Sequence, residues 1–201
     1  YSINYNNPLE GLSTPKTSSQ DLVVKPKYNG NIAEVLWNSS SLNNPNNELK
    51  IYGYVYDDLN RLLAGFYQPN NNKSSNEHSE ILTYDLNGNI ETLNRTAYLQ
   101  GNIPVLIDDL TYDYTGTGNR LNKVTDASGN SSGFEGAYPM FGDNGTIPYD
   151  ANGNMTSMPG KNIRSINYNY LNLPKSISLN YPNNSNTSYT YRADGVKVNK
   201  V

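Results

Sequence analysis

A short motif recurs along this chain and constrains its fold more than any other feature. It consists of a tyrosine, usually an aspartate, two or three residues typical of turns, and then an aliphatic residue. The closest copies are Tyr56–Leu62, Tyr84–Ile90 and Tyr149–Met155, and less regular copies begin at Tyr28, Tyr112, Tyr168 and Tyr191. This repetition predicts an array of similar structural units.

Each copy predicts a β-hairpin. Asn29-Gly30, Asn87-Gly88, Asn152-Gly153 and Asp194-Gly195 are dipeptides that tolerate positive φ at both central positions of a type I′ turn. We also expect Asp85 and Asp150 to accept hydrogen bonds from backbone amides of their own turns, as in Asx-turns. The residues expected to build the repeat are Tyr56, Asp57, Tyr84, Asp85, Gly88, Tyr112, Asp113, Tyr149, Asp150, Gly153, Tyr168, Tyr170, Tyr191 and Gly195.

Residues before these turns alternate with period two, which places tyrosines on one face of each strand. Facing tyrosines on neighbouring strands would form cross-strand ladders, each pair contributing roughly 0.2–1 kcal/mol. The sets expected to share a face are Tyr52, Tyr54 and Tyr56; Leu110, Tyr112 and Tyr114; Tyr168 and Tyr170; and Tyr189 and Tyr191.

The predicted fold is all-β, a long antiparallel strip of repeated hairpins with about 14 strands. A strip of this length is expected to curve or to continue into further repeats, because flat open sheets are unusual and expose their edges. Residues 1–27 are expected to be an extended leader or linker with at most one strand, and residues 28–201 the repeat segment of a longer chain. Polar loops are expected at Asn38–Asn47, Gln68–Glu80 and Gly129–Gly145. The 34 Asn and 18 Tyr favour sheet and turn over helix.

Composition and charge argue against several classes of function. With 15 Lys and Arg against 18 Asp and Glu, the chain lacks the basic surface that nucleic-acid binding requires. The absence of cysteine excludes disulfides, thiolate metal sites and cysteine nucleophiles. No apolar run of about 18 residues occurs, so membrane insertion is not expected. Because Tyr1–Tyr5 does not resemble a signal peptide, we expect this segment to begin inside a longer chain.

The Asp-x-Asn-Gly-Asn runs at Asp85 and Asp150 suggest a calcium loop as one interpretation, because oxygen ligands at alternate positions open such loops. The sixth position, where glycine is needed, would be Ile90 or Met155. The twelfth position, where glutamate is needed, would be Thr96 or Lys161. Hydrogen bonding within a hairpin turn explains the same residues better, so neither a metal nor another cofactor is expected.

No catalytic constellation is recognisable, and we expect the chain to be non-enzymatic. His78 is the only histidine and is expected to lie solvated in a polar loop. The pairs Asp57-Asp58 and Asp108-Asp109 fit exposed strand ends better than a glycosidase pair, although hydrolysis through Asp108 or Asp113 stays open as an enzymatic alternative. Gly116-Thr117-Gly118 lacks the third glycine and the strand–helix context of a phosphate loop, so a turn insertion is favoured.

Carbohydrate binding is the stronger alternative to a purely structural role. Tyrosine and asparagine side chains bind sugars by stacking and hydrogen bonding, and both residue types are abundant here. The sequence therefore leaves open a cell-surface adhesin or carbohydrate-binding module, with glycans as partners.

The ordered set of motifs resembles the YD-repeat, or RHS-repeat, family in the form found in Bacteroidota, over nearly the whole chain. Tyr28–Ile32 with Trp37 is similar to the segment that precedes the family's repeats. The segments similar to repeat units are Tyr54–Leu62, Tyr84–Ile90, Tyr149–Met155, Ile166–Pro174, which resembles a unit late in such arrays, and Tyr191–Val196, which resembles the unit that follows it.

The resemblance implies an antiparallel β-strip that spirals into a hollow shell. Such shells enclose or present a carboxy-terminal polymorphic region, often a toxin, and their walls carry no catalytic, cofactor or metal residues. Family members in Bacteroidota are commonly exported, many by the type IX secretion system. The resemblance therefore implies a secreted or cell-surface location. The implied partners are the rest of the protein's own longer chain and a secretion translocon or its accessory proteins.

Overall fold

The computed structural model describes residues 1–9, 22–38, 48–69, 75–98, 103–114, 118–134, 145–180 and 185–201. Two compact units divide the chain, Tyr1–Leu110 and Thr111–Val201. The described residues form twelve strands: β1 (Ser2–Asn4), β2 (Glu34–Trp37), β3 (Lys50–Tyr56), β4 (Leu62–Pro69), β5 (Glu80–Tyr84), β6 (Ile90–Tyr98), β7 (Pro104–Asp113), β8 (Lys123–Asp126), β9 (Ile163–Tyr168), β10 (Pro174–Leu179), β11 (Asn186–Tyr191) and β12 (Lys197–Lys200).

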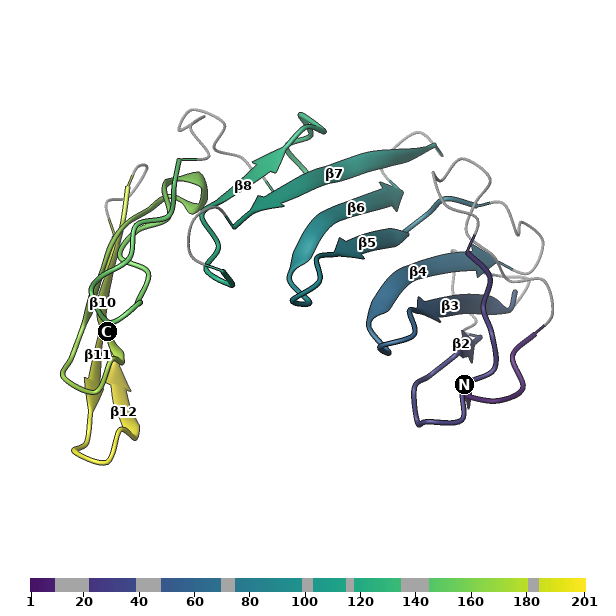
Figure 1. Ribbon diagram of the computed structural model, residues 1–201, viewed down its shortest axis with the longest axis horizontal. Helices are drawn as coiled ribbons and strands as arrows, with labels where there is room; N and C mark the ends of the chain where they lie inside the picture. The colour runs from purple at the N-terminus through teal and green to yellow at the C-terminus, as the bar shows by residue number, and fades with distance from the viewer. Residues whose placement is uncertain are drawn as a thin grey trace. The chain divides into compact units, whose positions relative to one another are not determined.

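Consecutive strands lie side by side in two open sheets, which confirms the predicted all-β antiparallel fold. Strands β1 to β8 form one sheet in sequence order, and β9 to β12 form a second sheet, also in sequence order (Figure 1). The described residues include no α-helix, only the 3-10 turn Pro159–Lys161. None of the helical structure in these residues is long and apolar enough to cross a membrane.

The expected alternation of side chains is confirmed in β3. Ile51, Gly53 and Val55 point to the buried face, whereas Tyr52, Tyr54 and Tyr56 are half-buried on the opposite face. Strand β4 continues the buried face with Ala64, Phe66 and Gln68. The first unit therefore has an aliphatic core face and a tyrosine face on the same sheet.

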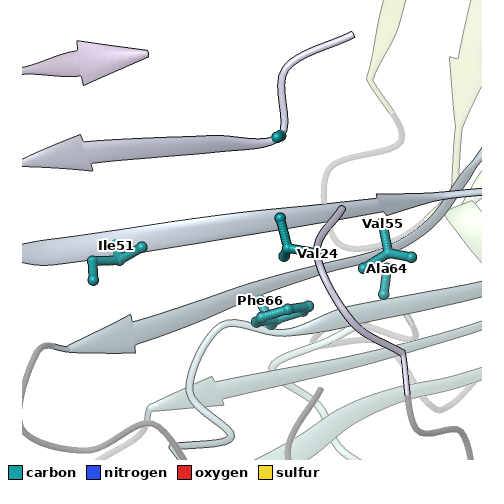
Figure 2. Packing of buried hydrophobic residues seen from close by; sticks show 6 residues of the cluster. Val24, Ile51, Val55, Ala64 and Phe66 are labelled. Carbon is teal, nitrogen blue, oxygen red and sulfur yellow. The ribbon is translucent and has the colours of Figure 1, made fainter. Parts of the chain in front are cut away.

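Part of the predicted leader closes this core. Val24 lies against Phe66 on the core face of the sheet, as Figure 2 shows. Strand β1 pairs with β2, and the buried Glu34 Oε1 accepts hydrogen bonds from Asn4 Nδ2 at 2.6 Å and from Leu9 N at 3.0 Å. The described residues of segment 1–27 are thus packed onto the repeat sheet.

The predicted polar loops Asn38–Asn47 and Gly129–Gly145 fall mainly outside the described residues, and Gln68–Glu80 falls partly outside them. Residues 39–47, 70–74 and 135–144 belong to these predictions and are not described. Within the predicted loop Gln68–Glu80, Gln68 and Pro69 belong to β4 and Glu80 begins β5, so both strands extend farther than expected.

Substitution of Gly53 by alanine is expected to destabilise the first unit, because a Cβ atom would lie 2.8 Å from Val24 Cγ2 and 3.1 Å from Phe66 Cε2. We expect Gly53→Ala to cost about 1–3 kcal/mol in urea unfolding. In the Val24→Ala background the same substitution should cost less, because the nearest clash is removed. A neutral Gly53→Ala, or strictly additive effects, would contradict this account of the packing.

Candidate functional site

The recurring unit is a five-residue turn that follows a tyrosine. The first residue of each turn donates its N–H to the carbonyl of the fifth, and the fourth donates its N–H to the carbonyl of the first, at 2.9–3.1 Å. The five turns are Asp57–Arg61, Asp85–Asn89, Asp150–Asn154, Asn169–Leu173 and Arg192–Val196.

The prediction of type I′ turns is wrong. Gly88, Gly153 and Gly195 have positive φ, at 89°, 85° and 86°, but the residues before them do not. Asn60 and Asn172 take the same left-handed position in the other two turns, with φ of 64° and 58°. One left-handed residue after two right-handed ones defines a three-residue hairpin loop with a glycine-type bulge. The Asn-Gly signal alone could not distinguish these turns, because both place glycine in the left-handed region.

A carboxylate at the first position favours this geometry in three of the five turns, those that begin at Asp57, Asp85 and Asp150. Asp85 Oδ1 accepts hydrogen bonds from the amides of Asn87 and Asn89, both at 2.8 Å, and Oδ2 accepts one from Asn89 Nδ2 at 2.8 Å. Asp150 makes the same three bonds with Asn152 and Asn154. The predicted Asx-turn role of both aspartates is therefore confirmed. These bonds satisfy amides in a right-handed turn conformation and so favour it over type I′.

These hydrogen bonds also stabilise the ionised aspartates. The Asn89 side-chain amide, together with backbone amides of the turn and against the opposing effect of burial, holds the pKa of Asp85 below its ordinary value of 3.8. The Asn154 side-chain amide lowers the pKa of Asp150 in the same way. Burial raises the pKa of Asp57, but the hydrogen bonds and charge of Arg61 outweigh it and leave this pKa lowered too.

A second irregularity follows four of the five turns. In the β5–β6 hairpin Tyr84 is opposite Ile90 and Thr83 is opposite Thr92, so Glu91 has no partner. The same one-residue shift occurs beside Tyr56, Tyr168 and Tyr191. A bulge redirects the side chains around it and bends the strand. In each of these four hairpins the unpaired residue lies on the strand after the turn, opposite the motif tyrosine and its neighbour.

Each motif tyrosine reaches the hairpin or turn before it in the chain. Its hydroxyl donates a hydrogen bond to a backbone carbonyl there, at 2.7–3.0 Å. The donor and acceptor residues are Tyr56 and Ile32, Tyr84 and Leu62, Tyr149 and Leu121, Tyr168 and Met155, and Tyr191 and Pro174.

These bonds lie where the backbone ladder between hairpins has ended. Strands β4 and β5 pair only at Ala64 with Ile81 and at Gly65 with Glu80, and the Leu62 carbonyl lies beyond that ladder. Strands β10 and β11 likewise pair from Ser176 to Ser178, and Pro174 lies beyond. The tyrosine hydroxyl replaces the missing backbone donor, so it extends the contact between hairpins past the last backbone bond.

The expected cross-strand tyrosine ladders are not what holds the motif tyrosines. The tyrosine ring pairs Tyr52–Tyr54 and Tyr189–Tyr191, with centroids 5.1 and 6.5 Å apart, lie along a strand and not between hairpins. Across hairpins, a guanidinium lies on the ring: Arg61 is 4.5 Å from the Tyr84 centroid and Arg120 is 5.0 Å from that of Tyr149. Each motif tyrosine is instead held by the bond from its hydroxyl to the preceding hairpin or turn.

Arginine and glycine are paired between successive turns. Arg61 Nε contacts Asp57 Oδ2 at 2.6 Å in its own turn, and its Nη1 donates to the carbonyl of Asp85 in the next turn at 3.2 Å. It passes close to Gly88, where a Cβ atom would lie 3.7 Å from Arg61 Nη1. A Cβ atom on Gly153 would lie 3.2 Å from Arg120 Nη2. At Gly153 the missing Cβ atom therefore leaves room for the arginine, whereas at Gly88 the contact would be an ordinary van der Waals one.

Asparagine at that position uses a different contact. Asn172 Oδ1 accepts hydrogen bonds from Asn152 Nδ2 at 3.0 Å and from Asn154 Nδ2 at 2.9 Å, both from the preceding turn. Asn60 Oδ1 accepts in the same way from Asn29 and Asn31, at 2.5 and 3.5 Å. These contacts between turns explain part of the high asparagine content.

The remaining predicted repeat residues do not follow this pattern. Tyr112 is half-buried in β7, and Asp113 closes its longer loop by accepting from Asn122 Nδ2 at 2.8 Å. Residues 115–117, with Gly116-Thr117 of the predicted turn insertion, lie outside the described residues, whereas Gly118 has φ of 66°.

Tyr170 lies inside its turn and is 81% exposed, so it does not share a strand face with Tyr168. Tyr28 is also exposed, and none of the strands in the described residues leads directly into its Asn29-Gly30 corner.

The prediction that Asp108-Asp109 mark an exposed strand end is wrong. Both residues lie within β7, and Asp108 is fully buried, where its Oδ2 contacts Arg95 Nη2 at 2.6 Å. Asp109 Oδ1 accepts from Asn94 Nδ2 at 2.6 Å. A paired arginine makes burial of the carboxylate possible, and the sequence offered no signal of this pairing because Arg95 is on another strand.

The other polar candidates are dispersed. His78 is exposed, as expected, in the turn before β5, and it borders an aromatic cleft. Across the ranges that the structure describes, no three His, Asp or Glu side chains come together to hold a metal ion. Asp108 and Asp113 each contact a different partner, so the structure does not join them in one site.

No protein-family model matches this chain, and no curated protein matches it either.

Removal of one motif hydroxyl tests the joint between hairpins. Tyr84→Phe loses the 2.7 Å bond to the Leu62 carbonyl and leaves that carbonyl without its donor. We expect a loss of about 1–2 kcal/mol in urea unfolding. Tyr170→Phe removes an exposed hydroxyl from the same residue type and should change stability little. Equal effects of the two substitutions would contradict a structural role for the motif hydroxyl.

The lowered pKa values predict loss of stability in acid. A carboxyl group whose pKa is depressed by folding stabilises the fold above its ordinary value of 3.8, and this contribution disappears as pH falls through the lower folded value. Asp85→Asn should therefore be less stable than the parent chain at pH 7, with the difference shrinking toward pH 2. Urea midpoints between pH 2 and 7 measure this. Asp58→Asn, at an exposed neighbouring position, serves as the control, and a difference for Asp85→Asn that is independent of pH would refute the mechanism.

Proposed function

We propose that residues 28–201 are a non-catalytic wall segment of a secreted protein of the RHS/YD-repeat type, with residues 1–27 leading into it. The observation that carries the proposal is the bond from a tyrosine hydroxyl to the backbone of the preceding hairpin or turn, which is made five times. An array that extends by one kind of joint is the architecture expected of a repeat protein whose units contact mainly their neighbours.

The use of polar residues supports the same conclusion. The aspartates of the motif have their carboxylate oxygens occupied by their own turns, and Arg61 bridges one turn and the next. Groups used in this way are held in the turn and are not presented to a substrate. A wall needs such internally satisfied groups, because it must persist without a ligand.

The proposed wall belongs to a β-shell that encloses a carboxy-terminal, toxin-like polymorphic region. The resemblance to RHS/YD-repeat proteins of Bacteroidota supports this cargo, together with export by the type IX secretion system to the cell surface or the medium. The partners in this proposal are the rest of the same longer chain and the translocon or its accessory proteins.

Protease protection tests enclosure. In the natural polypeptide that carries residues 1–201, the enclosed region should resist trypsin under conditions in which the same region, expressed alone, is digested. Combining Tyr84→Phe with Tyr149→Phe should weaken two joints and speed its digestion. Digestion of the enclosed region at the same rate with and without the wall would contradict enclosure.

Localisation tests export separately. The protein should be found in the medium or on the surface of its host, and it should accumulate inside cells that lack a functional type IX translocon. Unchanged surface exposure in those cells would refute this route while leaving the wall proposal to the protease experiment.

A further inference from the structure

An aromatic cleft on the tyrosine face of the first unit is not used by the repeat joints. It has a volume of about 370 Å³ and is lined by Trp37, Lys50, Tyr52, Tyr67, Glu77 and His78. These residues come from β2, β3, β4 and the turn before β5. Its volume is within the range of small-molecule sites in proteins, roughly 300–1,000 Å³.

The aromatic rings form one connected wall. The centroids of Trp37 and Tyr67 are 6.0 Å apart with planes tilted by 41°, and Tyr67 meets His78 edge-on at 6.3 Å. Tyr52 donates its hydroxyl to the His78 carbonyl at 3.1 Å. Trp37, Tyr52 and Tyr67 are all half-buried, so each ring keeps surface available to a ligand.

The turn that carries Glu77 and His78 is fixed in place. Thr96 Oγ1, from β6, donates to the Asn76 carbonyl at 2.5 Å and accepts from the Ser79 amide at 3.0 Å. Ser75 and Ser79 on either side are buried. This support holds His78 at φ 49°, a left-handed conformation that costs energy for a residue other than glycine.

Charge selects the class of ligand. The lining residues carry one ammonium group, from Lys50, and one carboxylate, from Glu77, and neither belongs to an ion pair within the described ranges. The carboxylates of Glu48 and Glu80 also act on Tyr67 and Tyr52 of the cleft. An anionic ligand would meet these carboxylates, and a cationic one would face Lys50 inside the cleft. A purely apolar ligand would leave both groups desolvated and unpaired. The lining therefore suits a neutral molecule with an apolar face and several groups that both donate and accept hydrogen bonds.

We propose that this cleft binds a neutral pyranose, with the C–H face of the sugar ring packed on Trp37 and Tyr67 and its hydroxyls bonded to Lys50, Glu77 and His78. A pyranose combines an apolar ring face with equatorial hydroxyls that donate and accept. The site uses none of the five tyrosine hydroxyl joints, so it adds a binding function to the proposed wall and does not depend on it.

Trp37 makes the site directly measurable, because it is the only tryptophan of the chain. The chain of residues 1–201 is titrated separately with D-glucose, D-galactose, D-mannose and N-acetyl-D-glucosamine while tryptophan emission is recorded. For at least one sugar we expect a saturable change in emission with a dissociation constant on the order of 1 mM, because a ligand of about twelve non-hydrogen atoms makes few contacts. D-sorbitol, which carries hydroxyls but no ring face, and tetramethylammonium, a cation, should give no saturable change.

Three variants separate binding from folding. Lys50→Gln and Glu77→Gln alter groups at the cleft without removing an ion pair and should each weaken the best sugar about tenfold. His78→Gly should also weaken binding, but its urea midpoint should stay equal or rise because glycine relieves the left-handed strain. Tyr170→Leu, at an exposed tyrosine of the second unit, is the matched control and should bind as the parent does.

The contrary results are equally defined. The proposal is overturned if no pyranose gives a saturable change, or if D-sorbitol or tetramethylammonium binds as tightly as the best sugar. Unchanged affinity in both Lys50→Gln and Glu77→Gln overturns it as well, and neither variant requires the removal of an aromatic ring from the fold.

Discussion

The bond from a tyrosine hydroxyl to the backbone carbonyl of the preceding unit is the interaction on which the repeat depends. An isolated two-stranded hairpin is marginally stable in water, so each unit needs its neighbour. Yet β4 and β5 share only two residue pairs, which leaves the turn ends of adjacent hairpins without backbone bonds. The Tyr84 hydroxyl crosses that gap to the Leu62 carbonyl at 2.7 Å. Tyrosine suits this task because its ring supplies apolar contact area along the path and its hydroxyl supplies the donor at the end.

The turn and the tyrosine are adjacent in the chain. The carboxylate of Asp85 fixes the turn by accepting two backbone amides, and the Tyr84 hydroxyl beside that turn is bonded to the preceding hairpin. Asn169 keeps the two amide bonds without a charge, so the geometry of the turn does not require ionisation of its first residue. At Arg192 no such acceptor exists, yet the backbone bonds of the turn still form around Gly195. Individual copies of the motif can therefore lack the charge, or the acceptor oxygen as well, and still form the turn.

The sequence was sufficient for the hairpins, the antiparallel order and the shared face of Tyr52, Tyr54 and Tyr56, because these follow from period-two alternation and turn residues. It was insufficient for the turn type, since glycine after asparagine is compatible with both geometries. The burial of Asp108 was missed because its partner Arg95 is on a different strand. The aromatic cleft was missed for the same reason: Trp37, Tyr67 and His78 come together only through strand register.

Side-chain contacts between successive turns cannot be recognised within a single copy of the motif. The fifth residue of one turn contacts the next turn at or beside its fourth residue. Arg61 lies beside Gly88 in one such pair, and Asn154 donates to Asn172 in another. Leu173 extends this matching to an apolar pair, because its Cδ1 lies 3.5 Å from the Cβ position of Gly195. At Gly153 a Cβ atom would lie 3.2 Å from Arg120 Nη2, and glycine in place of Asn172 would leave the amides of Asn152 and Asn154 without their acceptor. In these three pairs the fourth residue of a turn contacts the fifth residue of the turn before it, so neighbouring hairpins meet through specific side chains as well as through the tyrosine hydroxyl.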